Sequence, residues 1–186
     1  MKFKIKTLSV LLSLILIVLC SINSAYAQKL DDVIEIEDFE DLYKSGDFYM
    51  GGQPSYDMLK WLKSENVSLV INLRTKDENK RFTKSSFNEK ETLKDLGVVY
   101  KSIPISYPDS YNPENLKKFA EVLSKKDGKV FIHCASGGRV MSFMMAYLAQ
   151  EKGYTLNEAM EFGKELGFMF HLENLLGKDI EMTIKE

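Results

Sequence analysis

The sequence has few of the residues on which disulfide-rich and zinc-binding proteins depend. Its 186 residues include two cysteines and two histidines. Two cysteines cannot build a disulfide framework, and no cluster of Cys and His supplies the usual ligand count of a zinc site. The sequence therefore predicts no disulfide scaffold, no metal and no other cofactor.

A surplus of positive charge is also missing. Lys and Arg number 25 against 27 Asp and Glu, a formal net charge of -2. Proteins that bind the phosphate backbone of nucleic acids carry an excess of basic residues, so a nucleic-acid partner is not expected. With four prolines, 45% hydrophobic and 28% charged residues and no biased tract, the composition is that of one ordinary folded domain.

The long apolar run in the chain lies near the N-terminus. Three lysines precede the apolar residues 8–19, and Ala25-Tyr26-Ala27 has the small-x-small pattern of a cleavage site. The run is shorter than the roughly 20 residues that a membrane span needs. Residues 1–27 are therefore predicted to be a signal peptide that exports the protein to the periplasm or the medium. Tethering to the membrane by an uncleaved signal is the alternative.

Residues 28–186 are predicted to form one domain, which begins with an acidic lead-in over residues 28–46. The expected strands are 48–50, 67–73, 98–105 and 129–133. The expected helices are 58–63, 85–96, 113–125, 140–152 and 155–166, with a polar loop over 74–84. Alternating strands and helices predict a compact α/β domain of three layers with a central, mostly parallel sheet.

The most specific chemical pattern lies at Cys134, where a predicted buried strand ends and a helix begins. Ligands of open α/β sheets bind at the carboxyl ends of strands. Gly137 and Gly138 let backbone N–H groups turn inward at a helix N-terminus, and the Arg139 guanidinium can hold two oxygens of a phosphate. The same positive field favours a thiolate at Cys134. We therefore interpret this segment as an anion-binding loop with its own nucleophile, against the alternative of a buried structural thiol.

The order of residues from His133 to Arg139, His-Cys-x-x-Gly-x-Arg, resembles the signature of cysteine-dependent protein tyrosine and dual-specificity phosphatases. The longer span that includes GGQP (51–54), VINLR (70–74) and IPI (103–105) is similar to the bacterial beta-lactamase hydrolase-like, phosphatase-like domain family. The resemblance implies a dual-specificity-phosphatase-like fold. It also implies hydrolysis of phosphomonoesters, on proteins or small molecules, through a phosphocysteine.

The resemblance also implies roles for individual residues. Cys134 would attack phosphorus, and Arg139 would clamp the phosphoryl oxygens. Donors to the same oxygens would be the backbone amides of Ala135, Ser136, Gly137 and Gly138. Asp109, in a proline-bounded loop before the cysteine, is the candidate general acid, with Glu114 in reserve.

Two further residues are weaker candidates for substrate contact. Arg74 follows a predicted strand, and a surface arginine is the equal alternative. His133 precedes the nucleophile, where it either tunes the thiolate or is a satisfied core histidine. His171 is expected to be structural.

The pattern departs from tyrosine phosphatases at two positions. Four residues separate Cys134 from Arg139, where that signature has five, and four is also the length in rhodanese-type sulfurtransferases. Val140 stands where phosphatases usually offer a hydroxyl to the cysteine leaving group, with Ser136 or Ser142 as substitutes, so slow breakdown of a phosphoenzyme is expected. Two alternatives stay open: a sulfurtransferase that carries a persulfide on Cys134, and a non-catalytic domain that binds phospho-ligands.

Overall fold

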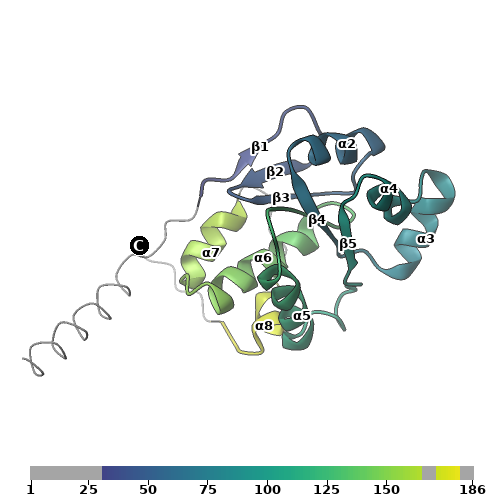
Figure 1. Ribbon diagram of the computed structural model, residues 1–186. Coiled ribbons are helices and arrows are strands. Elements are labelled where there is room, and N and C mark those ends of the chain that lie inside the picture. Colours follow the sequence, from purple (N-terminus) through teal and green to yellow (C-terminus); the bar gives the residue numbers. More distant parts are fainter. Residues whose placement is uncertain (1–30, 165–170, 181–186) are drawn as a thin grey trace, which may run out of the picture. The chain divides into compact units, whose positions relative to one another are not determined.

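The computed structural model describes residues 31–164 and 171–180 (Figure 1). The predicted signal peptide and the last residues of the predicted helix 155–166 lie outside the described residues. In the part of the chain that is described, no helix combines the length and apolarity needed to cross a membrane.

A six-stranded sheet runs through the domain in the order β1-β2-β3-β6-β4-β5. The strands are β1 (Ile34–Glu35), β2 (Leu42–Ser45), β3 (Phe48–Gly51), β4 (Val67–Asn72), β5 (Val99–Ser102) and β6 (Lys129–His133). The first three pair antiparallel, whereas β3, β6, β4 and β5 pair in parallel. The prediction of a mostly parallel central sheet is confirmed.

Helices cover both faces of this sheet. They are α2 (Tyr56–Ser64), α3 (Lys76–Ser85), α4 (Glu89–Asp95), α5 (Pro113–Ser124), α6 (Gly138–Glu151), α7 (Leu156–Gly163) and α8 (Leu172–Leu176). In Figure 1, α2 and α4 lie on one side of the strands, with α5 and α6 on the other. The predicted three-layer α/β architecture is therefore confirmed.

The core follows from the alternation of side chains along the strands. Tyr49, Val70 and Phe131 share one face, where they belong to an apolar cluster with Leu59 of α2 and Leu93 of α4. Along the same strands Met50, Ile71 and Ile132 point to the opposite face and have no exposed surface. Burial on both faces is the reason that these strands read as almost continuous apolar runs.

The predicted polar loop over residues 74–84 is wrong, because most of it is helix α3. Thr75 caps this helix: its hydroxyl accepts from the Glu78 amide at 3.2 Å, and the Glu78 carboxylate accepts from the Thr75 amide at 2.7 Å. This reciprocal pair is a capping box. No residue of α3 is buried, so the helix has no apolar periodicity that would have revealed it.

The acidic lead-in also contains regular structure that the sequence did not predict. Strands β1 and β2 both lie within it, and Leu42 is completely buried. Ile36 and Phe39 pack against the core, as expected for apolar residues that dock on the domain. Two further boundaries differ, since α4 begins at Glu89 rather than near residue 85, and β5 covers only Val99–Ser102.

Candidate active site

The loop between β6 and α6 carries the predicted nucleophile. Strand β6 ends at His133 and α6 begins at Gly138, with the Cys134 side chain only 1% exposed between them. Gly137, the N-cap of α6, has a φ of 84°, in the left-handed region that side chains disfavour. The predicted junction of strand end, glycine turn and helix N-terminus is present.

Backbone hydrogen bonds connect this loop to the end of β3 and the residues that follow it. The Cys134 amide donates to the Gly51 carbonyl at 3.3 Å, and the Gln53 amide donates to the Ala135 carbonyl at 3.1 Å. A Cβ atom on Gly51 would lie 2.2 Å from the Asp41 carbonyl oxygen, which is closer than real contacts allow. The first glycine of the GGQP segment is therefore required by a close backbone approach.

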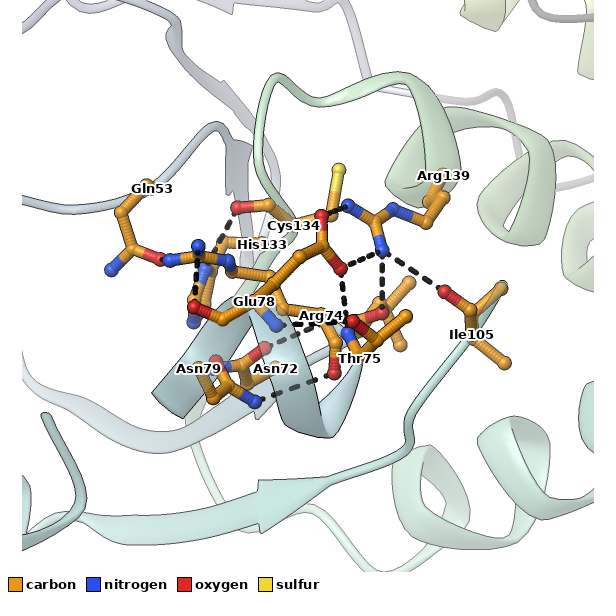
Figure 2. Close-up of polar contacts among 11 residues, drawn as sticks. Gln53, Asn72, Arg74, Thr75, Glu78, Asn79, Ile105, His133, Cys134 and Arg139 are labelled. Carbon is orange, nitrogen blue, oxygen red and sulfur yellow. Dashed lines mark hydrogen bonds and ion pairs between the residues drawn. The ribbon is translucent and has the colours of Figure 1, made fainter. Parts of the chain in front are cut away.

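Arg139 lies beside the loop and is fixed by a carboxylate from α3 (Figure 2). Its Nη2 donates to Glu78 Oε1 at 2.6 Å and its Nη1 to Glu78 Oε2 at 2.8 Å. Nη1 also donates to the carbonyl oxygens of Leu73 at 3.3 Å and Ile105 at 2.9 Å. One edge of the guanidinium is thus held by the protein in a bidentate geometry.

The ion pair stabilises the charges of both partners. Hydrogen bonding to Arg139 lowers the pKa of Glu78 to about 2. The same bond to Glu78 raises the pKa of Arg139 against the opposing effect of burial, and the neighbouring Cys134 side chain adds to the rise. A guanidinium has five N–H donors, so the edge that faces Cys134 keeps donors for an anion.

Arg74 is buried, with 9% of its surface exposed, so its interpretation as a surface arginine is wrong. Its Nη1 donates to Gln53 Oε1 and its Nη2 to the Glu78 carbonyl at 3.0 Å. Its guanidinium carbon lies 5.2 Å from the centre of the Phe82 ring. Burial lowers the pKa of Arg74, while the charges of Glu78 and Glu89 oppose that shift. Arg74 therefore connects α3, through the Glu78 carbonyl, to Gln53, whose backbone amide binds the Ala135 carbonyl of the Cys134 loop.

His133 is completely buried below the loop. Its Nε2 lies 2.7 Å from Glu89 Oε1, and its Nδ1 lies 3.3 Å from the Cys134 carbonyl oxygen. The ring stacks on Phe131, with 5.2 Å between the ring centres. The histidine thus has polar partners on both ring nitrogens.

Glu89 and Asn72 complete a polar cluster under the site. Glu89 Oε2 accepts from Asn72 Nδ2 at 3.2 Å and from Gln53 Nε2 at 3.4 Å. Asn72 is fully buried, and its Oδ1 accepts from the Arg74 amide at 2.7 Å. Asn72 Nδ2 also donates to the Tyr100 hydroxyl at 3.1 Å. Burial, together with the charge of Glu89, raises the pKa of Tyr100 to about 12.

Sequence reasoning missed four of these residues: Gln53, Asn72, Glu78 and Glu89. The first two lie in the segments GGQP and VINLR, which pointed to the family but not to a role. The capping-box spacing of Thr75 and Glu78 was a usable indication of a helix. Glu89 offered no local pattern, because its partner His133 is 44 residues away.

Asp109 lies in the turn that connects β5 to α5, and its side chain is exposed. Its carbonyl oxygen accepts from Asn112 Nδ2 at 2.8 Å. The segment that leads to this turn passes Ile105, whose carbonyl is bound by Arg139. Glu114, the reserve candidate, is exposed and pairs with Lys118 at 2.8 Å, which lowers the pKa of Glu114. Arg139 therefore contacts the segment that leads to Asp109, whereas the partner of Glu114 is Lys118.

The two candidate hydroxyls differ in their surroundings. Ser136 is exposed in the loop and forms an isolated β-bridge with Gly52. Ser142 is buried one turn into α6, where its hydroxyl donates to the Gly138 carbonyl at 3.2 Å. Val140 itself is 1% exposed. Within residues 31–164 and 171–180, no three His, Cys, Asp or Glu side chains gather closely enough to hold a metal ion.

Comparison with known proteins gives matches over most of the chain. The profile of a family described as "DSP-PTPase phosphatase fused to NAD+ Kinase" matches residues 23–168. Tyrosine-protein phosphatase CDC14 of Saccharomyces cerevisiae is 28% identical over 114 residues, which are 59% of this chain and 19% of CDC14. The Beta-lactamase hydrolase-like protein of Agrobacterium fabrum is 25% identical over 119 residues, which are 64% of this chain and 27% of that protein. The chain thus spans about a quarter or less of the length of these relatives.

A solved structure shows the same fold. The crystal structure of TpbA from P. aeruginosa superposes with a TM-score of 0.60 at 18% identity, covering 82% of this chain and 92% of TpbA. At this level of identity the likeness concerns the arrangement of the backbone.

Proposed function

Because the chain belongs to the family of DSP-PTPase phosphatases fused to NAD+ kinase, we propose that it hydrolyses phosphomonoesters through a phosphocysteine on Cys134. One observation carries the proposal: the Arg139 guanidinium is fixed by Glu78 along one edge and directs its other edge to the Cys134 loop. A nucleophile beside a pre-positioned cation is the arrangement that phosphoryl transfer requires.

Substrate binding would use the remaining Arg139 donors and the backbone of the loop. The Cys134 amide and the Ala135 carbonyl are bonded to the end of β3. The amides that follow Cys134, at the N-terminus of α6, would then donate to the phosphoryl oxygens. The positive end of the helix dipole adds to this attraction for an anion.

The first chemical step would form a bond between Cys134 Sγ and phosphorus as the ester P–O bond breaks. The leaving oxygen takes a proton from Asp109. Arg139 binding to Ile105 supports this assignment, because it holds the start of the segment that carries Asp109 next to the loop.

The second step would be attack of water on the phosphocysteine. The water gives a proton to the Asp109 carboxylate, the P–S bond breaks, and the thiolate and inorganic phosphate are released. Val140 cannot donate a hydrogen bond to the leaving thiolate, and the Ser142 hydroxyl is bonded to a helix carbonyl. These features support slow breakdown of the intermediate.

Phosphotyrosine is the first substrate to test, since TpbA of P. aeruginosa has been crystallised with phosphotyrosine. The proposal covers protein phosphotyrosine and phosphoserine as well as small phosphomonoesters. We also propose that residues 1–27 export the protein, and an N-terminus at residue 28 in the periplasmic or secreted fraction is the expected result.

A sulfurtransferase is the second candidate, favoured by the four residues between Cys134 and Arg139 and by Val140. The deciding experiment measures phosphotyrosine hydrolysis and thiosulfate-to-cyanide sulfur transfer side by side, with Cys134→Ser and Asp109→Asn variants. We expect phosphate release that is lost in Cys134→Ser and strongly reduced in Asp109→Asn. Sulfur transfer without phosphate release would overturn the proposal, and ligand binding without either reaction would indicate a non-catalytic domain.

A further inference from the structure

A cluster of aromatic rings lies at the turn that carries Asp109. The rings of Tyr107 and His171 stack, with 3.9 Å between their centres and 26° between their planes. The ring of Tyr111 is nearly perpendicular to both, with its centre 5.6 Å from that of Tyr107 and 5.3 Å from that of His171. The two tyrosines flank Asp109 in the chain, whereas His171 directly precedes α8. The cluster therefore joins the Asp109 turn to a distant part of the sequence.

The side chain of His171 serves the stack and not the helix that it precedes. His171 is the N-cap residue of α8, yet its side chain makes no capping hydrogen bond. The helix is fixed by apolar contacts instead, because Leu172 and Leu175 are buried and α8 packs against α5 and α6 (Figure 1). A well-anchored helix thus presents the His171 ring to Tyr107.

Hydrogen bonds within the turn give it a defined shape. The Ser110 amide donates to the Ser106 carbonyl at 2.9 Å, and the Tyr111 amide donates to the Pro108 carbonyl at 3.0 Å. Both bonds join residues of the turn to each other. They fix its shape, but its place relative to the Cys134 loop depends on contacts with other elements.

One such attachment ties the turn to α6. Tyr111 is 3% exposed, and its ring centre lies 5.8 Å from that of Phe143 in this helix. Burial raises the pKa of Tyr111, and the charge of the neighbouring Arg139 opposes that rise. Arg139 also binds the carbonyl of Ile105, where the segment begins. The second attachment is the stack on His171, which ties the same turn to α8.

We propose that His171 is a positioning residue, which holds the Asp109 turn in place beside the Cys134 loop by stacking on Tyr107. Asp109 is exposed, so the place of its carboxyl group follows the backbone of the turn. A misplacement of about 1 Å can cost on the order of 100-fold in rate. The stack requires a flat ring and no particular protonation state. The inference rests on the proposed function in taking Asp109 as the general acid.

Amide hydrogen exchange tests whether the His171 ring orders the turn. In the full-length chain, the Ser110 and Tyr111 amides should be protected by their bonds within the turn. His171→Asn removes the ring but leaves a good N-cap residue, so we expect both amides to exchange on the order of tenfold faster. His171→Phe should restore the protection, and Asn174→Ala, at an exposed position of α8, should not change it. Equal exchange in the unmodified chain and His171→Asn would overturn the inference.

The dependence on the leaving group tests whether this order serves Asp109. The phenol of tyrosine, with a pKa of about 10, needs a proton as it leaves, whereas dinitrophenolate leaves readily without one. In His171→Asn we expect kcat/KM to fall on the order of tenfold for phosphotyrosine and less than about twofold for dinitrophenyl phosphate. His171→Phe should keep both values. Losses of equal size for the two substrates would indicate a general structural defect and contradict the role assigned to His171.

These measurements separate the two proposals. Hydrogen exchange uses no phosphorylated substrate, so it decides whether His171 holds the turn even in a chain without activity. An unmodified chain that releases no phosphate from either substrate refutes the proposed function. A chain that hydrolyses phosphotyrosine equally well with and without the His171 ring refutes the inference alone.

Discussion

The Glu78 carboxylate and the Arg139 guanidinium form a bidentate ion pair across 61 residues of sequence, with oxygen–nitrogen distances of 2.6 and 2.8 Å. Glu78 itself is anchored by the capping box at the start of α3. The orientation of the arginine therefore depends on a helix that precedes the Cys134 loop by two strands and two helices.

Replacing Glu78 with Gln removes the charged partner of Arg139. Hydrogen bonds to charged groups contribute about 1.5–3 kcal/mol, so we expect kcat/KM for phosphotyrosine to fall on the order of tenfold to 100-fold. Asp77→Asn, at an exposed neighbouring position of the same helical turn, is the control and should retain activity. Equal activities of the two variants would show that Arg139 needs no carboxylate to be positioned.

The same ion pair should affect stability at acidic pH. The pKa of Glu78 is about 2 in the folded protein, below the value of about 4.3 of an unperturbed glutamate. A lowered pKa stabilises the folded state above pH 4.3, and this contribution is lost as the pH falls through 4 toward 2. Urea unfolding should show a gap between the unmodified chain and Glu78→Gln at pH 6 that shrinks below pH 4. A difference in the free energy of unfolding that grows as the pH falls would contradict this prediction.

A methyl group at residue 51 should disturb the support of the loop. The Cβ of Gly51→Ala would lie 2.2 Å from a backbone oxygen, which cannot move aside as a flexible side chain would. Overpacking of this kind costs about 1–3 kcal/mol, and we expect both lower stability and lower activity. Gly97→Ala is the control, because its φ of 66° brings strain while no atom lies within 4 Å of the added Cβ. That variant should lose stability but keep the activity of its folded fraction.

Oxidation should affect the proposed activity, because among the described residues Cys134 is a free thiol with no cysteine partner. We expect peroxide to abolish phosphatase activity, and phosphate or sulfate to slow the loss by occupying the anion site. The measurement is the inactivation rate with phosphate, sulfate or chloride at equal ionic strength. A rate that ignores anion occupancy would argue against Cys134 lying at the bottom of the site.

Val140 should limit the release of phosphate from the cysteine. We expect a burst of product from the first step, followed by slower turnover, when phosphotyrosine is mixed with a high enzyme concentration. A Val140→Thr variant offers a hydroxyl near the leaving thiolate and should reduce the burst relative to steady turnover. Because residue 140 is only 1% exposed, the added threonine hydroxyl is buried and can destabilise the fold. Unfolding curves of both proteins therefore serve as the control for stability. No burst in the unmodified chain would mean that the second step is not rate-limiting.

Much of the fold could be predicted from local sequence because burial constrains residue type. Strands β4 and β6 are buried on both faces and read as apolar runs, and the Ser55 and Thr155 caps mark helix starts. Helix α3 could not be found in this way, since it buries no residue. The short strands β1 and β2 lie in an acidic segment whose pairing depends on β3.

The candidate site was predictable where its residues are neighbours in the chain. The segment from Cys134 to Arg139 indicated an anion loop, and the family match confirms the resemblance to cysteine-dependent phosphatases. Glu78 and Glu89 escaped prediction because each meets its partner only through tertiary contacts. The same is true of Arg74, whose burial depends on Gln53 and Phe82. Local patterns thus predicted the candidate reacting groups, while the residues that contact them became apparent only in the structure.

Trapping the phosphoenzyme tests the central claim most directly. Acid quenching of the full-length chain during turnover of phosphotyrosine, followed by peptide mass spectrometry, should show one phosphoryl group on the peptide that contains Cys134. Asp109→Asn should still carry the adduct while releasing phosphate more slowly, and Cys134→Ser should release none. A phosphoryl group on another residue, or phosphate release that survives Cys134→Ser, would contradict the account.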